Sequence, residues 1–218
     1  GDFSVSGNGL LTFRPPAPMP PRRLVWLDRT GAVTNEIDGK VLYRFPETAP
    51  DGKTIAVEIV EWASASGNLW LMGLGGENRS RLTLDPRGDC CPVWSPDGTR
   101  LVFASPRGGP ADLYWKVTRP GAPDEVLLTS RSSQAPVSWS ADGRFLVFQV
   151  REGGRSDLWA LPMNGKRTPF PILQTPADEI GGRISPDGRW ITYYSDEPRP
   201  WSVFVERFSP GGRPVQQE

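Results

Sequence analysis

The sequence predicts an all-β fold, a β-propeller built of four-stranded antiparallel blades, because one turn-and-strand motif recurs at a constant spacing. The motif contains the tripeptide Asp-Gly-Xaa, where Xaa is polar, followed by a strand of apolar residues. Its three best copies are Val93–Phe103, Ser138–Phe148 and Arg183–Tyr193. Looser copies occur at Thr48–Val57 and Val5–Phe13. Five blades are therefore recognisable, either as a five-bladed ring or as part of a ring with six or more blades.

The spacing of the copies supports this fold. The motif aspartates Asp51, Asp97, Asp142 and Asp187 stand 46, 45 and 45 residues apart. Repeats of about 40 to 50 residues are typical of propeller blades, in which each repeat forms one small sheet. A second landmark, the tripeptide that opens the third strand, keeps the same spacing at Asn68–Trp70, Asp112–Tyr114 and Asp157–Trp159.

A third observation concerns the second strand of each repeat. Leu101–Ala104 and Phe145–Phe148 are continuous apolar runs rather than alternating patterns. A continuous run indicates a strand that is covered on both faces. In a propeller, neighbouring blades provide this cover without any helix. No stretch shows a useful helical periodicity, so we expect almost no helix.

The repeats divide the chain in order into a single propeller domain, 1–218. The predicted blades are residues 1–42, 43–88, 89–133, 134–177 and 178–218. In the first, strands are expected near Phe3–Val5, Leu10–Phe13, Arg23–Asp28 and Thr34–Ile37. The proline-rich stretch Pro15–Pro21 is expected to be a stiff connecting loop, with a polyproline ligand for an aromatic groove as the alternative. In the last blade, the outermost strand near Pro214–Gln216 is expected to be cut short.

Composition argues against several classes of function. The 25 basic and 25 acidic residues balance, so nothing favours nucleic acid or an anionic membrane as a partner. No apolar stretch is long enough to insert in a membrane, and we expect no secretory leader within this segment. The chain contains no histidine, which removes serine and cysteine nucleophiles activated by histidine. We therefore expect no enzyme activity and no cofactor.

The repeated aspartates and the two cysteines each allow two interpretations. The aspartates are expected to stabilise the hairpin turns through side-chain hydrogen bonds to backbone amides, with the following glycine in the left-handed conformation. A ring of calcium ligands is the alternative, but aspartates in different blades do not converge on one ion, so no metal is expected. Cys90 and Cys91 are expected to lie on opposite faces of a strand, with a vicinal disulfide as the alternative.

The innermost strands suggest one binding surface. Their residues align in two columns, of which one is expected to pack between blades: Val5, Thr48, Trp94, Trp139 and Ile184. The neighbouring column is more polar and is expected to line the central channel: Ser4, Glu47, Val93, Ser138 and Arg183. We predict a channel site formed by Glu47, Ser138 and Arg183.

The loops between second and third strands are the other candidate surface. They span residues 62–67, 106–110, 151–155 and 196–200, and they are rich in tryptophan and arginine, which dominate interface energetics. The predicted site residues are Trp62, Arg107, Arg151, Arg155, Arg199 and Trp201. The alternative is that these are solvated loop ends.

The motifs together resemble a known family. The Trp-Ser-Pro-Asp-Gly motif, the Asp-Leu-Trp or Asp-Leu-Tyr tripeptide and the closing Leu82–Thr83 and Leu128–Thr129 resemble the TolB-type propeller repeat, a relative of the WD-type repeat. The segments Phe3–Gly9 and Leu24–Gly31 are similar to propellers attached to bacterial receptor serine/threonine kinases.

This resemblance implies a non-catalytic sensor or interaction module that binds a protein or peptide. It also implies a periplasmic or extracellular location, as the extracytoplasmic part of a larger bacterial protein. If the chain holds only some of the blades of its ring, its open faces would favour self-association. The alternative function is a glycosidase-like hydrolase with paired carboxylates, drawn from Glu47, Asp89, Asp178 and Glu179.

Overall fold

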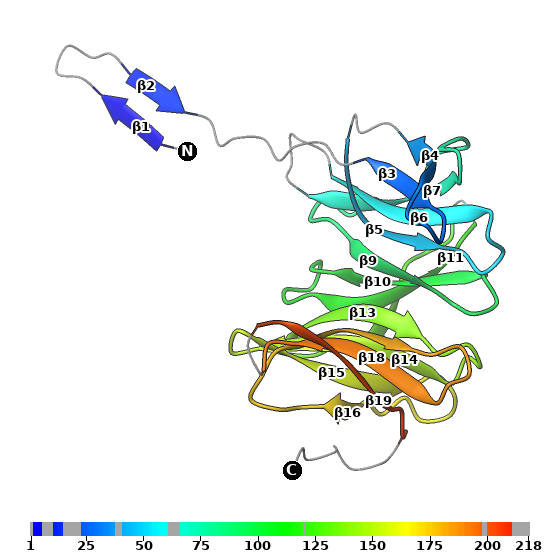
Figure 1. Ribbon diagram of the computed structural model, residues 1–218. Helices are drawn as coiled ribbons and strands as arrows, with labels where there is room; N and C mark the ends of the chain where they lie inside the picture. Colours follow the sequence, from blue (N-terminus) through cyan, green and yellow to red (C-terminus); the bar gives the residue numbers. More distant parts are fainter. Residues whose placement is uncertain are drawn as a thin grey trace.

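The computed structural model describes residues 2–5, 11–14, 23–37, 41–60, 66–119, 121–197 and 200–210. All regular elements in these ranges are β-strands (Figure 1). Three antiparallel sheets have four strands each, paired in chain order from the inside outward. A fourth sheet has three strands. The described residues contain no helix that is long and apolar enough to cross a bilayer.

The complete sheets correspond to the second, third and fourth repeats. The second repeat contains β5 (Leu42–Thr48), β6 (Thr54–Val60), β7 (Gly67–Gly73) and β8 (Ser80–Arg81). The third contains β9 (Cys90–Trp94), β10 (Arg100–Ser105), β11 (Asp112–Val117) and β12 (Glu125–Leu128). The fourth contains β13 (Ser133–Trp139), β14 (Phe145–Glu152), β15 (Arg155–Pro162) and β16 (Phe170–Leu173).

The fifth repeat forms a sheet from β17 (Glu179–Ile184), β18 (Trp190–Ser195) and β19 (Ser202–Arg207). The outer strand expected near Pro214–Gln216 lies outside the described residues. The four sheets follow one another in space: in Figure 1, β5–β7 lie at the top and β9–β11 below them, and the last two sheets, with β13–β16 and β18–β19, overlap at the bottom. Their innermost strands β5, β9, β13 and β17 contact one another in succession. This is a propeller arrangement, and the predicted all-β fold class is confirmed.

The first repeat differs from the prediction in its strand pairing. Its four expected strands are present as β1 (Asp2–Val5), β2 (Leu11–Arg14), β3 (Leu24–Leu27) and β4 (Val33–Ile37). However, β1 pairs only with β2 and β3 only with β4, so the repeat forms two sheets of two strands instead of one blade. The segment between β2 and β3 contains five prolines, which cannot donate backbone hydrogen bonds and do not favour a tight hairpin. The predicted blade boundaries stay a prediction.

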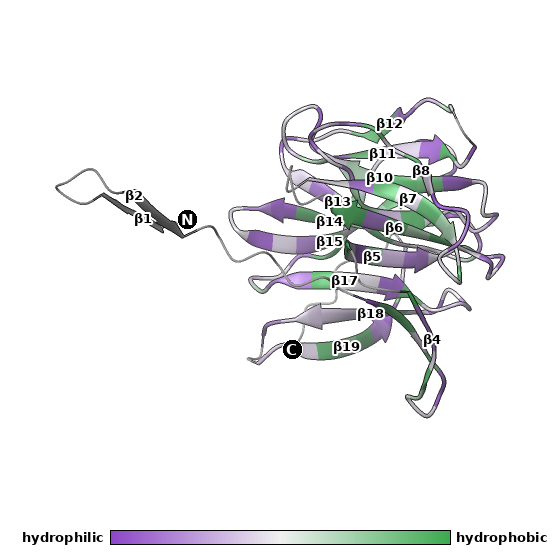
Figure 2. Cartoon of the chain, turned by 90° about the horizontal axis from the view of Figure 1, so that it is seen from above, coloured by the Kyte–Doolittle hydropathy of each residue, from purple (hydrophilic) through white to green (hydrophobic). Residues whose placement is uncertain are grey.

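The hydrophobic core lies between sheets. Between the second and third blades, Trp94 and Phe103 pack against Leu69 and Ala56. Equivalent clusters join the third blade to the fourth and the fourth to the fifth. On the other side of the second blade, Leu24 and Trp26 of β3 pack over a cluster that includes Tyr43. Figure 2 shows the green, apolar residues concentrated in the inner strands.

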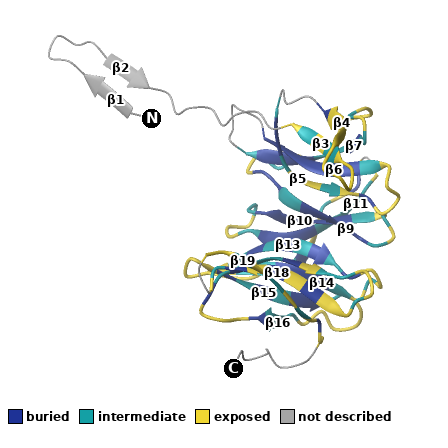
Figure 3. Ribbon diagram, viewed as in Figure 1, coloured by how far each residue is buried: buried dark blue, intermediate teal, exposed yellow. Residues whose placement is uncertain are grey.

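The second strands confirm this two-sided burial. Leu101–Ser105 is buried throughout, as are Ile55–Val60 and Leu146–Phe148. In the last sheet, by contrast, β18 alternates, with Trp190 and Tyr194 exposed. Its neighbour β19 exposes Val203 and Val205 beside them, so one face of this sheet is uncovered (Figure 3). The same sequence position is therefore buried or exposed according to whether another sheet follows.

The motif turns have the predicted chemistry. The Asp97 carboxylate accepts hydrogen bonds from the Ser95 hydroxyl at 2.6 Å and from the Thr99 backbone N–H at 3.0 Å. The Gly98 N–H donates to the Ser95 carbonyl across the turn, and Gly98 has φ of 70°. Asp142 and Asp187 make the equivalent hydrogen bonds in the next two repeats. The aspartates therefore act as turn residues.

Each innermost strand also carries an irregularity that the sequence analysis did not predict. The pairing register of β5, β9, β13 and β17 shifts just before the channel residue. Phe45 (φ 47°), Cys91 (φ 59°) and Gly181 (φ 69°) occupy equivalent positions there, all in the left-handed region. Such bulges re-aim the following side chains. In each strand the residue that follows the bulge, Glu47, Val93, Ser138 or Arg183, lines the channel mouth.

The bulge overturns the prediction for the cysteines. Cys90 and Cys91 were expected on opposite faces, but the left-handed backbone of Cys91 brings the two Sγ atoms to 3.0 Å, with both thiols free. The contact with Cys90 and burial raise the pKa of the Cys91 thiol. The pair thus forms a neutral, partly buried thiol contact at the innermost strand of the third blade.

The turn geometry predicts the effect of replacing Gly143, which has φ of 75° and no neighbouring atom within 4 Å of the place that a Cβ would take. Because space is available, only the left-handed backbone opposes a side chain. We expect Gly143→Val to lower the free energy of unfolding by about 1–3 kcal/mol. Gly143→Asn should cost less, because asparagine tolerates this conformation. Urea unfolding of both variants tests this, and equal losses would refute a conformational cause.

The turn aspartates predict an acid-sensitive contribution to stability. Backbone and hydroxyl donors lower the pKa values of Asp142 and Asp187 from 3.8 to about 2. Because these pKa values are lower in the folded state, the contribution is present above pH 4 and is lost as the pH falls toward 2. Both carboxylates are solvent-accessible, so the effect should be small.

The double variant Asp142→Asn/Asp187→Asn tests this contribution, because it keeps the acceptor oxygens but removes the titrating groups. It should lose less stability than the parent between pH 4 and 2, as measured by urea midpoints. An identical pH profile would contradict this assignment.

Candidate functional site

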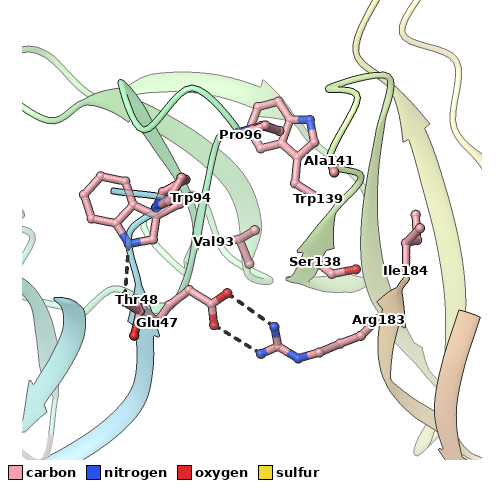
Figure 4. A pocket seen from close by; sticks show the side chains of 11 residues that line it. Glu47, Thr48, Val93, Trp94, Pro96, Ser138, Trp139, Ala141, Arg183 and Ile184 are labelled. Atoms are coloured by element: carbon pink, nitrogen blue, oxygen red, sulfur yellow. Dashed lines mark hydrogen bonds and ion pairs between the residues drawn. The ribbon is translucent and has the colours of Figure 1, made fainter. Parts of the chain in front are cut away.

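The channel mouth is a cavity where the four innermost strands end next to the motif turns (Figure 4). Its volume is about 320 Å³. Each of the four sheets contributes residues from the end of its innermost strand or the following turn. The lining residues are Glu47, Thr48, Pro50, Val93, Trp94, Pro96, Ser138, Trp139, Ala141, Arg183 and Ile184.

An ion pair crosses this mouth. The Arg183 guanidinium donates two hydrogen bonds to the Glu47 carboxylate, at 3.1 and 3.3 Å, although the residues are 136 positions apart. The pair joins β17 of the last blade to β5 of the second. The contact with Glu47 raises the pKa of Arg183. The Arg183 side chain is still 58% exposed, so solvent and ligands can reach the cation.

Apart from Thr48 and Ser138, the rest of the mouth is apolar, and internal hydrogen bonds hold its side chains in place. The Trp94 indole donates from Nε1 to the Glu47 carbonyl at 3.0 Å, and the Trp139 indole donates to the Gly143 carbonyl at 3.2 Å. The Ser138 hydroxyl donates to the Gly182 carbonyl of the next blade at 2.9 Å. Because these donors are already used within the chain, the tryptophan rings and the ion pair are the groups left for a ligand.

The structure brings all three predicted channel residues together, since Glu47, Ser138 and Arg183 line one cavity. It also shows that the division into a packing column and a channel column was too strict. Thr48, Trp94, Trp139 and Ile184 belong to the column expected to pack, yet they line the same cavity. A side chain at the end of a strand can pack on the next blade with one edge and face the cavity with the other. The side chains of Ser4 and Val5 lie outside the described residues.

The predicted loop site is not a single cluster. The loops between second and third strands lie at the opposite end of the blades from the motif turns, because consecutive strands are antiparallel. Arg151, Arg155 and Trp201 are exposed there. The Arg155 guanidinium donates to the Pro176 carbonyl at 2.9 Å. Trp62 and Arg199 lie outside the described residues.

Arg107 has a different environment from the other loop residues. Its guanidinium contacts Asp89 at 2.9 Å and Asp124 at 2.7 Å, and lies 4.4 Å from the centre of the Tyr114 ring. Lys116 shares Asp124 at 2.8 Å. These interactions tie the second-to-third-strand loop of the third blade to the residue before its innermost strand, Asp89, and to its two outer strands. The N–H donors of Arg107 are therefore already engaged within the blade and are not available to a partner.

The carboxylates considered for hydrolysis do not converge on the channel mouth. Glu47 is the one acidic residue among the described residues that line the channel mouth. Asp89 is buried against Arg107, and the Asp178 carboxylate accepts from the Ser156 N–H at 2.7 Å. Glu179 is buried and accepts a hydrogen bond from Thr175, and burial raises its pKa. A glycosidase needs two carboxylates facing one cleft, and the channel mouth presents one.

Comparisons with known proteins agree with this architecture. The family model described as TolB beta propeller domain matches residues 29–213. A candidate TolB from Agrobacterium tumefaciens is similar in structure, with a TM-score of 0.72 and 19% identity, covering 94% of this chain and 78% of its own. TolB from Acinetobacter baumannii gives a TM-score of 0.61 and 18% identity over 79% of this chain and 45% of its own.

A prolyl endopeptidase is also similar, with a TM-score of 0.53 and 18% identity. That match covers 78% of this chain but 27% of the endopeptidase chain. The chain thus spans less than half of the Acinetobacter protein and about a quarter of the endopeptidase. At these identities the likeness concerns the fold.

The ion pair across the mouth predicts a coupling between distant blades. In a double-mutant cycle with Glu47→Gln and Arg183→Gln, we expect a coupling of about 0.2–1 kcal/mol in the free energy of unfolding, because the pair is partly exposed. The coupling should shrink as salt concentration rises. The same cycle on Asp187 and Arg189, which pair within one turn, provides a control that does not join two blades. Strict additivity for Glu47 and Arg183 at low salt would contradict a persistent ion pair.

Proposed function

The chain belongs to the TolB β-propeller domain family, and from this premise we propose that it is a non-catalytic module that binds a protein or peptide at its channel mouth. One observation carries the proposal: a partly exposed bidentate ion pair and two fixed indole rings line one cavity of about 320 Å³. Tryptophan and arginine are the residues that contribute most at interfaces.

The arrangement of side chains at the channel mouth favours binding of a partner over catalysis of a reaction. The Glu47–Arg183 pair presents a carboxylate and a guanidinium side by side, so a ligand with either charge can exchange hydrogen bonds with one member. The rings of Trp139 and of the largely buried Trp94 line the cavity in orientations fixed by internal hydrogen bonds, so their accessible edges supply apolar surface. Fixed rings lose little conformational entropy on binding. These features favour docking of an extended peptide segment.

The location and context belong to the same proposal. The resemblance of the motifs to propellers of bacterial receptor kinases supports a sensor or interaction domain in the periplasm or outside the cell, within a larger bacterial protein. The balanced charge supports a protein partner over nucleic acid. The uncovered face of β18 and β19 supports self-association as a further property to be tested.

Peptide selection on the immobilised protein tests the proposal. Peptides that bind the parent are measured against the charge-exchange variant Glu47→Arg/Arg183→Glu, which keeps an ion pair but reverses its direction. We expect binding to weaken at least tenfold, about 1.4 kcal/mol. The matched control is Arg151→Glu, at the other end of the blades. If selected peptides bind all three proteins equally, the channel mouth is not the docking site.

A further inference from the structure

A second cavity lies outside the channel mouth, in the groove between the third and fourth blades. Its volume is about 360 Å³. From the third blade it receives Arg100 at the start of β10 and Trp115 in β11. From the fourth it receives Trp139, Met163 and Arg167, the last two from the segment that joins β15 to β16.

Two guanidinium groups share one indole ring in this groove. The Arg100 guanidinium lies 4.3 Å and that of Arg167 4.5 Å from the centre of the Trp115 ring. The ring itself is fixed, because Trp115 Nε1 donates to the Glu125 carboxylate at 2.9 Å. Stacking on an aromatic face positions arginine while leaving its N–H donors available.

Neither arginine has an ion-pair partner among the described residues. The two aspartates that line the groove are already used in the motif turns. Asp97 accepts from Ser95 and Thr99, and Asp142 accepts from Ser140 and pairs with Arg144 at 2.6 Å. The groove therefore holds two cations that share one ring and that form no ion pair with the aspartates of the turns.

The repeat provides an internal comparison. The equivalent groove between the second and third blades has a volume of about 290 Å³ and the same framework of motif turns, with Trp94 at the position of Trp139. There the positions of Arg100, Trp115 and Met163 are taken by Thr54, Leu71 and Thr118. Two neighbouring blades therefore form this groove without an arginine at the position of Arg100 or a tryptophan at the position of Trp115. Their presence in one groove indicates a role beyond folding.

We propose that this groove binds a carboxylate of an acidic peptide segment, held by charge-assisted hydrogen bonds from Arg100 and Arg167. A carboxylate that accepts from both guanidiniums offsets their like charge, and such hydrogen bonds are stronger than neutral ones. The groove and the channel mouth share Pro96, Trp139 and Ala141, so a single extended peptide can occupy both. This inference rests on the proposed peptide binding and adds the chemistry of the ligand.

The test uses two fluorescent peptides made of repeated Glu-Ser-Gly or Gln-Ser-Gly units, which differ only in charge. We expect the glutamate peptide to bind the parent at least tenfold more tightly, with an affinity that falls as salt rises.

Arg100→Thr, which introduces the residue of the equivalent groove, and Arg167→Gln should each remove most of this preference. Trp115→Leu should weaken it as well. Arg189→Gln, which removes a cation from another turn, should leave it unchanged. Urea unfolding establishes that each variant is folded.

The outcomes separate this inference from the proposed function. If the glutamate peptide binds no better than the glutamine peptide, or Arg100→Thr and Arg167→Gln keep the preference, the groove is not a carboxylate site, whereas peptides selected on the channel mouth would still bind. If the preference survives the Glu47→Arg/Arg183→Glu exchange but is lost in Arg100→Thr, the groove binds carboxylates independently of the mouth.

Free glutamate and inorganic phosphate serve as competitors. Competition by phosphate at lower concentration than glutamate would overturn the assignment of a carboxylate ligand.

Discussion

Mutual burial of neighbouring sheets is the constraint on which the rest of this structure depends. A small sheet with apolar residues on both faces is stable only when another sheet covers each face. The clusters around Phe103, Phe148 and Tyr193 each lie between two consecutive blades. Polar chemistry is consequently displaced to the ends of the strands and to the innermost strands, where the channel and its mouth lie.

The last sheet, β17–β19, shows the effect of the same constraint where one face has no covering sheet. β18 has the repeat motif at its start, like β10 and β14, but Thr192 replaces their valines, Tyr194 stands where they have alanine and glutamine, and the strand alternates between buried and exposed positions. The sequence of this strand is adapted to having one covered face. Its exposed Trp190, with Val203 and Val205 of β19, nevertheless leaves apolar surface accessible. Such surface is typical of interfaces.

The two candidate sites arise from different departures from the repeat. At the channel mouth, the left-handed residues Phe45 and Gly181 bend the innermost strands just before Glu47 and Arg183, which meet across the cavity. In the groove between the third and fourth blades the backbone follows the repeat, and only side chains change, with Trp115 and Arg100 where the preceding blade has leucine and threonine. The common framework supplies the cavities, and substitutions at a few positions supply their chemistry.

By itself, the sequence determined the fold class, the antiparallel sheets of the four later repeats and the turn role of Asp97, Asp142 and Asp187, because periodic burial and turn hydrogen bonds are local and are repeated in every copy. It also placed Glu47, Ser138 and Arg183 in one column, since aligned repeats put equivalent residues at equivalent positions around an axis. Only the tertiary structure decided that Glu47 and Arg183 form a pair, that Cys90 and Cys91 touch, and that Arg100 and Arg167 meet over Trp115. The cysteine contact depends on the bulge at Cys91, and the other two depend on how different blades pack. The repeat pattern of the sequence carries no signal of either.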